Sequence, residues 1–250
     1  MTDIQLIIDL HRLSERQGPG SPADTLRALT FMDLPTDRPL KVADIGCGTG
    51  GQTMVLARQI HGHLTAVDLF PEFLEELDNR SRAAGWQDRI STLRCSMDDL
   101  PFPEQSFDIL WSEGAIYNMG FEHGVRAWKD FLKTGGYLAV SEATWITPDR
   151  PKEIERFWMN EYPEIDMAAA RIRILEDHGF SLTGYFQLDP ASWIDHYYQP
   201  LEAGFASFLE RQGHSEAARR VVDEYQAEID LYQKYQDYYS YGFYIARKCR

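Results

Sequence analysis

Apolar positions along the chain follow two different periods in turn. Short runs of consecutive apolar residues, typical of buried strands, alternate with stretches in which apolar residues recur every three or four positions, as on one helix face. The first part of this pattern predicts five strands, at 42–45, 64–68, 90–95, 107–111 and 137–140, with helices at 52–60, 71–85 and 125–132. Such alternation predicts an α/β fold in which helices cover both faces of a parallel sheet.

The pattern continues beyond the fifth strand. We expect a helix end and a turn at 133–136, two helices at 151–162 and 166–178, and a sixth strand at 180–188. An alternating segment at 241–247 predicts a last strand. Residues 190–239 between them form a long insertion whose later part has apolar and aromatic residues at helical spacing.

A helical pattern also precedes the sheet. Residues 3–16 predict one helix, which Gly18-Pro19-Gly20 breaks, and a second helix begins with Ser21 as N-cap and Pro22 at its first position. We therefore expect one domain, composed of N-terminal helices (1–39), a core (40–189), a helical cap insertion (190–239) and the last strand (240–250).

Charge and composition narrow the possible partners. The formal net charge is −14 and no run of Lys or Arg occurs, so we expect no nucleic-acid partner, which would need a basic face. No apolar run approaches the length of a membrane span, and residues 1–12 lack the basic region of a signal peptide. Three widely spaced cysteines predict reduced thiols and a cytoplasmic location, and no His or Cys spacing indicates a metal site.

A glycine-rich turn follows the first strand. Gly46, Gly48 and Gly51 fit the dinucleotide fingerprint G-x-G-x-x-G, and a ligand can lie directly on such a backbone. However, Asp44 stands two residues before the first glycine, where its charge would repel a pyrophosphate. A carboxylate there suits a ligand with a cationic end, such as the amino group and sulfonium of S-adenosylmethionine.

Polar residues follow the next three strands as well. Asp68 ends the second strand, at the distance from the loop where such sheets place a carboxylate on ribose hydroxyls. The cofactor candidates are Asp44, Gly46, Cys47, Gly48, Asp68, Leu69, Met97, Asp98 and Glu113, with Asp98 and Met97 assigned to adenine. Asp44 has a second possible role, which is to hold the glycine turn. Glu113 could bind an ammonium group of the substrate or take a proton, or it could equally contact the amino end of the methionine part of the cofactor.

This succession over roughly residues 40–145 resembles the class I S-adenosylmethionine-dependent methyltransferases. The remainder, with Tyr241-Gly242-Phe243 in its last strand, is similar to bacterial small-molecule methyltransferases. The resemblance implies a Rossmann-like, doubly wound sheet of seven strands, with the last strand antiparallel between the fifth and sixth. It also implies an N-terminal lid, for which a plain connector is the alternative, and a cap above the carboxyl edge of the sheet.

Methyl transfer from a sulfonium needs positioning more than a catalytic motif, because the leaving thioether is neutral. The candidates for a proton acceptor are Glu142, His123 and His196, each with a structural or solvent-exposed role as the alternative. We expect a small-molecule acceptor methylated at nitrogen or oxygen, with nearby acids and aromatic residues favouring an amine. The sequence does not determine the oligomeric state.

Two other functions remain open from the sequence. A nicotinamide oxidoreductase would use the same glycines and Asp68, but its Tyr-x-x-x-Lys spacing occurs only as Tyr244 and Lys248 within the last strand. A non-catalytic protein that binds S-adenosylmethionine is the second alternative.

Overall fold

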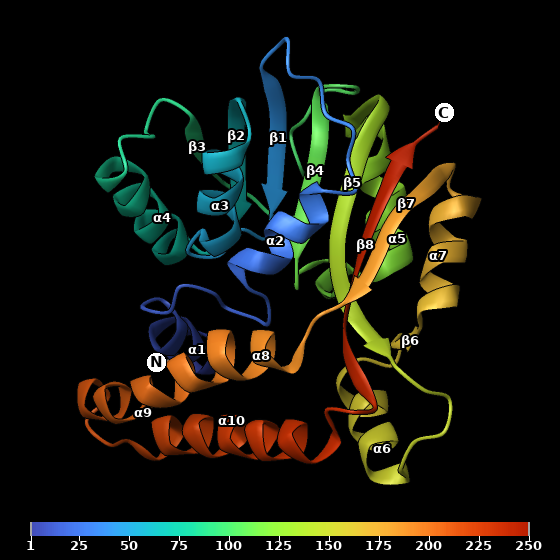
Figure 1. The fold of residues 1–250 in the computed structure, drawn as a ribbon. Coiled ribbons are helices and arrows are strands. Elements are labelled where there is room, and N and C mark those ends of the chain that lie inside the picture. Colours follow the sequence, from blue (N-terminus) through green and yellow to red (C-terminus); the bar gives the residue numbers. More distant parts are fainter. Residues whose placement is uncertain (1, 250) are drawn as a thin grey trace.

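The chain folds around one mixed β-sheet in a computed structural model that describes residues 2–249 (Figure 1). Neighbouring strands follow the order β3-β2-β1-β4-β5-β8-β7, and the short β6 pairs with β5. The strands are β1 (Leu40–Ile45), β2 (Gly62–Asp68), β3 (Ile90–Arg94), β4 (Phe107–Glu113), β5 (Leu132–Trp145), β6 (Asp166–Met167), β7 (Phe180–Gln187) and β8 (Tyr239–Lys248).

Strand β8 runs antiparallel to both of its neighbours, β5 and β7, whereas β1 to β5 pair in parallel. The seven-stranded, doubly wound sheet with an inserted antiparallel last strand is therefore confirmed. The two-residue strand β6 was not predicted, because residues 166–167 were assigned to the start of the following helix.

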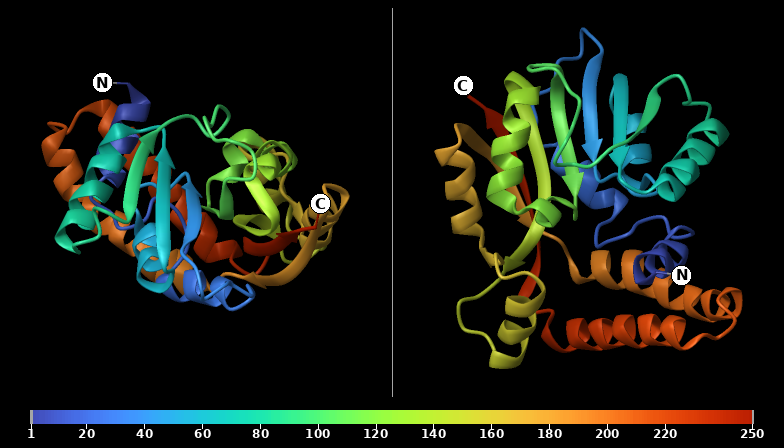
Figure 2. Two further views of the ribbon diagram at one scale, coloured as in Figure 1. Left: turned by 90° about the horizontal axis from the view of Figure 1, so that it is seen from above. Right: turned by 180° about the vertical axis from the view of Figure 1, so that it is seen from behind.

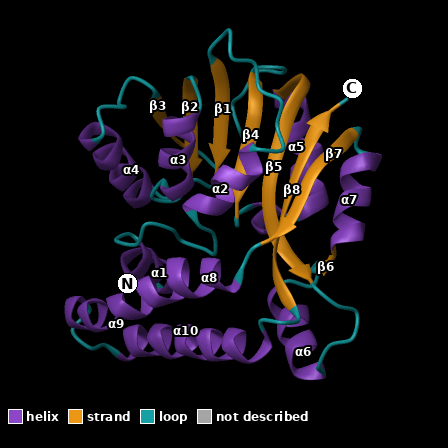
Figure 3. Ribbon diagram, in the orientation of Figure 1, coloured by secondary structure: helices purple, strands orange, loops and turns teal. Residues whose placement is uncertain are grey.

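Helices cover both faces of the sheet (Figure 3). One apolar cluster joins the sheet to α2 (Pro22–Leu29), α3 (Gly51–Gln59) and α4 (Pro71–Ala83). The other joins the opposite face to α5 (Phe121–Trp128) and α7 (Ala168–Asp177). Burial on both faces explains why the parallel strands read as continuous apolar runs in the sequence.

The remaining helices gather at the end of the sheet toward which the parallel strands point (Figures 1 and 2). They are α1 (Asp3–His11), α6 (Lys152–Glu161), α8 (Pro190–Trp193), the π-helix η3 (Ile194–Tyr198), α9 (Gln199–Arg211) and α10 (Glu216–Tyr235). Short 3-10 turns η1 (Ile116–Met119) and η2 (Lys129–Phe131) flank α5. Among residues 2–249, no helix is both long enough and apolar enough to cross a bilayer.

Two predicted boundaries were wrong. Strand β5 begins at Leu132, so residues 133–136 lie within it and do not end a helix. A register shift explains this, because Leu132 pairs with Phe107 and pairing resumes only between Tyr137 and Ile109. The first helix ends at His11, which leaves residues 12–21 as an irregular segment leading to α2. Ser21 caps α2 as predicted, since its hydroxyl accepts from the Asp24 amide at 3.1 Å.

Candidate functional site

The turn after β1 is shaped by glycines that no larger residue could replace without strain. Gly46 and Gly48 have φ values of +73° and +55°, in the left-handed region that favours glycine. A Cβ on Gly46 would lie 2.4 Å from the Cβ of Ala115. The amides of Gly46 and Cys47 donate to the carbonyl of Val67 at 2.8 and 2.9 Å, which fixes the turn against the end of β2.

Asp44 lies beneath this turn and does not line the cavity next to it. Its carboxylate accepts from the Thr53 hydroxyl at 2.5 Å and from the Gln52 amide at 3.2 Å. Burial raises the pKa of Asp44 to about 7, although both hydrogen bonds favour the charged form. The contacts of Asp44 therefore favour a role in holding the turn over direct contact with a cofactor.

Asp68 is the acid that reaches the turn from β2. One oxygen accepts from the Gly48 amide at 2.9 Å and the other from the Phe70 amide at 3.0 Å. Burial raises the pKa of Asp68. The other cofactor candidates that line the same side of the cavity are Leu69, Met97 and Asp98.

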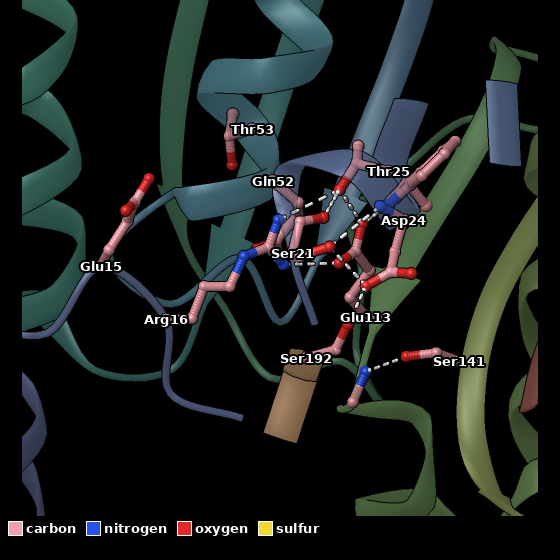
Figure 4. A network of polar contacts seen from close by, with 12 residues as sticks. Glu15, Arg16, Ser21, Asp24, Thr25, Gln52, Thr53, Glu113, Ser141 and Ser192 are labelled. Carbon is pink, nitrogen blue, oxygen red and sulfur yellow. Dashed lines mark hydrogen bonds and ion pairs between the residues drawn. The ribbon is translucent and has the colours of Figure 1, made fainter. Parts of the chain in front are cut away.

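Glu113, at the end of β4, lies within a network that ties the N-terminal segment to the sheet (Figure 4). Arg16 donates to one oxygen at 2.6 Å, and both side chains are almost fully buried. The other oxygen accepts from the Thr25 hydroxyl at 2.7 Å and the Trp111 indole at 2.8 Å. Sequence reasoning found Glu113 but missed Arg16, because nothing local to residue 16 indicates a partner 97 positions away.

The same N-terminal segment covers the glycine turn. The Gln17 side-chain oxygen accepts from the Thr49 amide at 2.8 Å, and the Thr49 hydroxyl donates to the Ser14 carbonyl at 2.8 Å. On its other side, the Gly20 amide donates to the carbonyl of Ser192 in α8 at 3.2 Å. Residues 12–21 thus bridge the glycine turn, β4 and the cap.

A single cavity of about 690 Å³ extends from the glycine turn to the cap. Its far part, here called the aromatic chamber, is lined by Tyr117, Trp193, Tyr197, Tyr225, Tyr241 and Glu228. The rings pack on one another: Trp193 and Tyr241 meet edge to face with centroids 4.9 Å apart. The sequence indicated the helix that carries Tyr225 but not that it lines a cavity.

The three predicted proton acceptors do not line this cavity. Glu142 is fully buried in β5, and among residues 2–249 neither of its carboxylate oxygens has a hydrogen-bond partner. His123 on α5 and His196 in η3 are both exposed. The sequence did not indicate the histidine that does line the cavity, His11, whose Nε2 lies 2.8 Å from the Tyr225 hydroxyl. Burial lowers the pKa of His11 to about 4, so its ring is neutral at pH 7.

The Tyr-x-x-x-Lys pair that an oxidoreductase would need, Tyr244 and Lys248, lies away from the cavity. Tyr244 contacts the Thr144 hydroxyl at 2.8 Å, while the Lys248 ammonium donates to the backbone carbonyls of Lys129 and Leu132. Neither side chain lines the cavity.

Residues 42–136, which span β1 to the start of β5, match the family described as a methyltransferase domain. Residues 42–136 therefore form a methyltransferase domain, and its fold is that of S-adenosylmethionine-dependent methyltransferases. Methyltransferase GfsG of Streptomyces halstedii is 31% identical over 103 residues, which are 41% of this chain and 37% of that protein. This chain spans less than half the length of the first curated relatives it matches, at 37%, 40% and 36% of their lengths.

Solved structures extend the similarity in fold to nearly the whole chain. YjhP from E. coli has a TM-score of 0.85 at 17% identity and covers 98% of this chain and 100% of its own. A methyltransferase from Geobacter sulfurreducens, solved with S-adenosylhomocysteine, has a TM-score of 0.82 at 18% identity, with 98% and 96% covered. At these identities the comparisons show the fold, including the cap.

Proposed function

We propose that this protein transfers the methyl group of S-adenosylmethionine to a nitrogen or oxygen of a small-molecule acceptor. The observation that carries the proposal is the single cavity with two differently built ends. One end has the glycine turn and the acids of β2 and β4, and the other is the aromatic chamber. A donor and an acceptor bound at these two ends would meet inside the protein, away from bulk water.

The residues at the glycine end fit an adenosyl donor. In this proposal the backbone of Gly46, Cys47 and Gly48 faces the methionine part, Asp68 holds the ribose, and Leu69, Met97 and Asp98 surround the adenine. The close approach of Ala115 to Gly46 supports it, because only a bare backbone leaves room beside the turn. Glu113 is assigned to the lid through Arg16, and Asp44 to the support of the turn.

The bound donor supplies an electrophilic methyl carbon and a neutral leaving group. The protein's part is to hold the acceptor atom in line with that carbon and exclude water, which can supply most of the acceleration. A nitrogen that arrives uncharged needs no base. His11 lines the cavity, but a pKa of about 4 makes it a weak base at pH 7, and its Nε2 is already bonded to Tyr225.

We also propose that lid, core and cap act as one domain in the cytoplasm. The bond from Arg16 to Glu113 of β4 and the bond from the Gly20 amide to Ser192 of the cap support the single domain. Free Cys47, Cys95 and Cys249 support a reducing compartment.

Calorimetric titration with S-adenosylmethionine, S-adenosylhomocysteine and NADH tests the donor. We expect micromolar or tighter binding of both adenosyl compounds and none of NADH. An assay for S-adenosylhomocysteine over pooled amines, phenols and alcohols then tests turnover. Tight NADH binding without adenosyl binding would refute the proposal, and adenosyl binding without turnover on any pool would favour a non-catalytic binding protein.

A further inference from the structure

The aromatic chamber has an acid on its wall that the proposed transfer step does not use. Glu228, on α10, lines the cavity, and one of its oxygens accepts from the Tyr198 hydroxyl at 2.9 Å. Among residues 2–249, no hydrogen bond is donated to its other oxygen, which is not sealed from the cavity. A half-buried carboxylate thus keeps one oxygen available for a ligand.

The charge of Glu228 acts on the surrounding rings. Burial is the main cause of the raised pKa values of Tyr197, Tyr198 and Tyr225, and the negative charge of Glu228 is the next cause for each. The pKa of Glu228 is itself raised, first by burial and also by the charge of Glu161, which lines the same end of the cavity. Two acids, Glu228 and Glu161, thus line this end of the cavity, where burial works against the charged form of Glu228 unless a cation lies beside it.

No unpaired positive charge lies among the described residues that line the cavity. Among the described residues that line the cavity, the basic side chains are Arg16 and His11. Arg16 is paired with Glu113 at 2.6 Å, and His11 is neutral at pH 7 because burial lowers its pKa to about 4. A carboxylate or phosphate ligand would meet repulsion here without a counter-charge.

Aromatic faces around a carboxylate such as Glu228 are a good site for an organic cation. Ring faces attract ammonium groups, most strongly where water is excluded, and the carboxylate adds a charge-assisted contact. We propose that the aromatic chamber binds a cationic ammonium group carried by the methyl acceptor, with Glu228 as its counter-charge. This inference rests on the proposed function only in naming the cation as the methyl acceptor. The binding of the cation can be measured without any methyl transfer.

The test compares two probes of nearly equal shape, choline and the uncharged 3,3-dimethylbutan-1-ol. Calorimetric titrations of the full chain, with and without saturating S-adenosylhomocysteine, are expected to show at least tenfold tighter binding of choline. Equal affinity for the two probes in both conditions would overturn the inference. If the protein bound choline more tightly than the neutral probe but did not bind S-adenosylhomocysteine, the result would count against the proposed function and not against this inference.

Glu228→Gln keeps the shape and an oxygen for Tyr198 but removes the charge. We expect it to weaken choline binding at least fivefold and to leave the neutral probe unchanged. Glu224→Gln is the matched control, since Glu224 is exposed one turn earlier on α10, and it is expected to change neither affinity. A similar loss in both variants, or in neither, would overturn the role of Glu228.

A second variant pair tests the rings. Tyr117 lines the chamber and is 40% exposed, so its replacement is not expected to unfold the protein. Tyr117→Leu is expected to weaken choline binding about threefold or more, and Tyr117→Phe to retain it, because a cation is attracted to the ring face and not to the hydroxyl. Equal effects of Leu and Phe would contradict a contact with the ring.

Discussion

Gly48 is a residue whose backbone, in the proposed function, contacts the donor directly. Its φ of +55° disfavours a side chain by about 1–2 kcal/mol. A Cβ there would also lie 2.0 Å from the side-chain oxygen of Gln17, which holds the Thr49 amide. We therefore expect Gly48→Ala to weaken S-adenosylmethionine binding at least tenfold, as measured by calorimetry.

Gly85→Ala is the control for this variant. Gly85 has a φ of +72°, but no atom lies within 4 Å of the position of an added Cβ. The backbone strain is therefore comparable, while the cavity is untouched. Both variants should lose stability, and only Gly48→Ala should lose affinity. Wild-type affinity in Gly48→Ala would show that the ligand does not lie on this turn.

Glu142 gives a prediction about pH. Burial raises its pKa from 4.5 to about 8, so the folded protein holds this proton more tightly than the unfolded chain. The resulting stabilisation is complete below pH 4.5 and is lost as the pH rises through 8. Because glutamine stays neutral, Glu142→Gln should gain stability relative to the wild type over this range, by roughly 5 kcal/mol at most.

Urea unfolding at pH 5 and pH 8.5 measures this difference, and exposed Glu224→Gln should show none. Since Glu142 does not line the cavity, the variant is also expected to retain turnover with any acceptor found. A loss of turnover above a hundredfold without loss of stability would instead support Glu142 as the proton acceptor.

At the scale of elements, the irregular segment 12–21 is held mainly by one buried ion pair. Arg16→Met would leave Glu113 charged and buried without a counter-charge, which typically costs about 3–5 kcal/mol. We expect a loss of stability of this order in urea unfolding, and faster amide hydrogen exchange in residues 12–21. The double variant Arg16→Met/Glu113→Gln should recover part of the lost stability, because it no longer has an unpaired buried charge.

A surface ion pair provides the comparison. Arg220 and Asp3 lie 3.1 Å apart with more than half of each side chain exposed, so Arg220→Met should cost less than about 1 kcal/mol. If Arg16→Met cost as little as Arg220→Met, the pair with Glu113 would not be what holds the segment.

The elements also show which parts of the structure can be predicted from the sequence. The succession of strands and helices and the glycine turn could be predicted, because alternation of strand and helix and the run around Gly46 are local patterns. The place of the last strand in the sheet followed only from the resemblance to a known family. The start of β5 could not, since it depends on the pairing of Leu132 with Phe107 of another strand. The aromatic chamber could not be predicted for the same reason. His11 and Tyr225 are in contact although they are 214 positions apart in the sequence, and no pattern near either residue indicates the other.

The charge of the whole molecule should affect how fast the donor binds. The chain has a formal net charge of −14, and acids including Asp68, Asp98 and Glu228 line the cavity. At neutral pH, S-adenosylmethionine has one net positive charge and S-adenosylhomocysteine has none. A field of this sign attracts the first compound and not the second, and salt screens the attraction.

We therefore expect the association rate of S-adenosylmethionine to fall about fivefold or more between 10 mM and 500 mM salt, while that of S-adenosylhomocysteine stays nearly constant. Stopped-flow tryptophan fluorescence can follow both, since Trp158 and Trp193 line the cavity. S-adenosylhomocysteine is the matched control, because it differs from the donor only by the methyl group and its charge. Equal salt dependence for the two compounds would mean that the net charge does not act on the site, and the acids of the cavity would then matter only at contact distance.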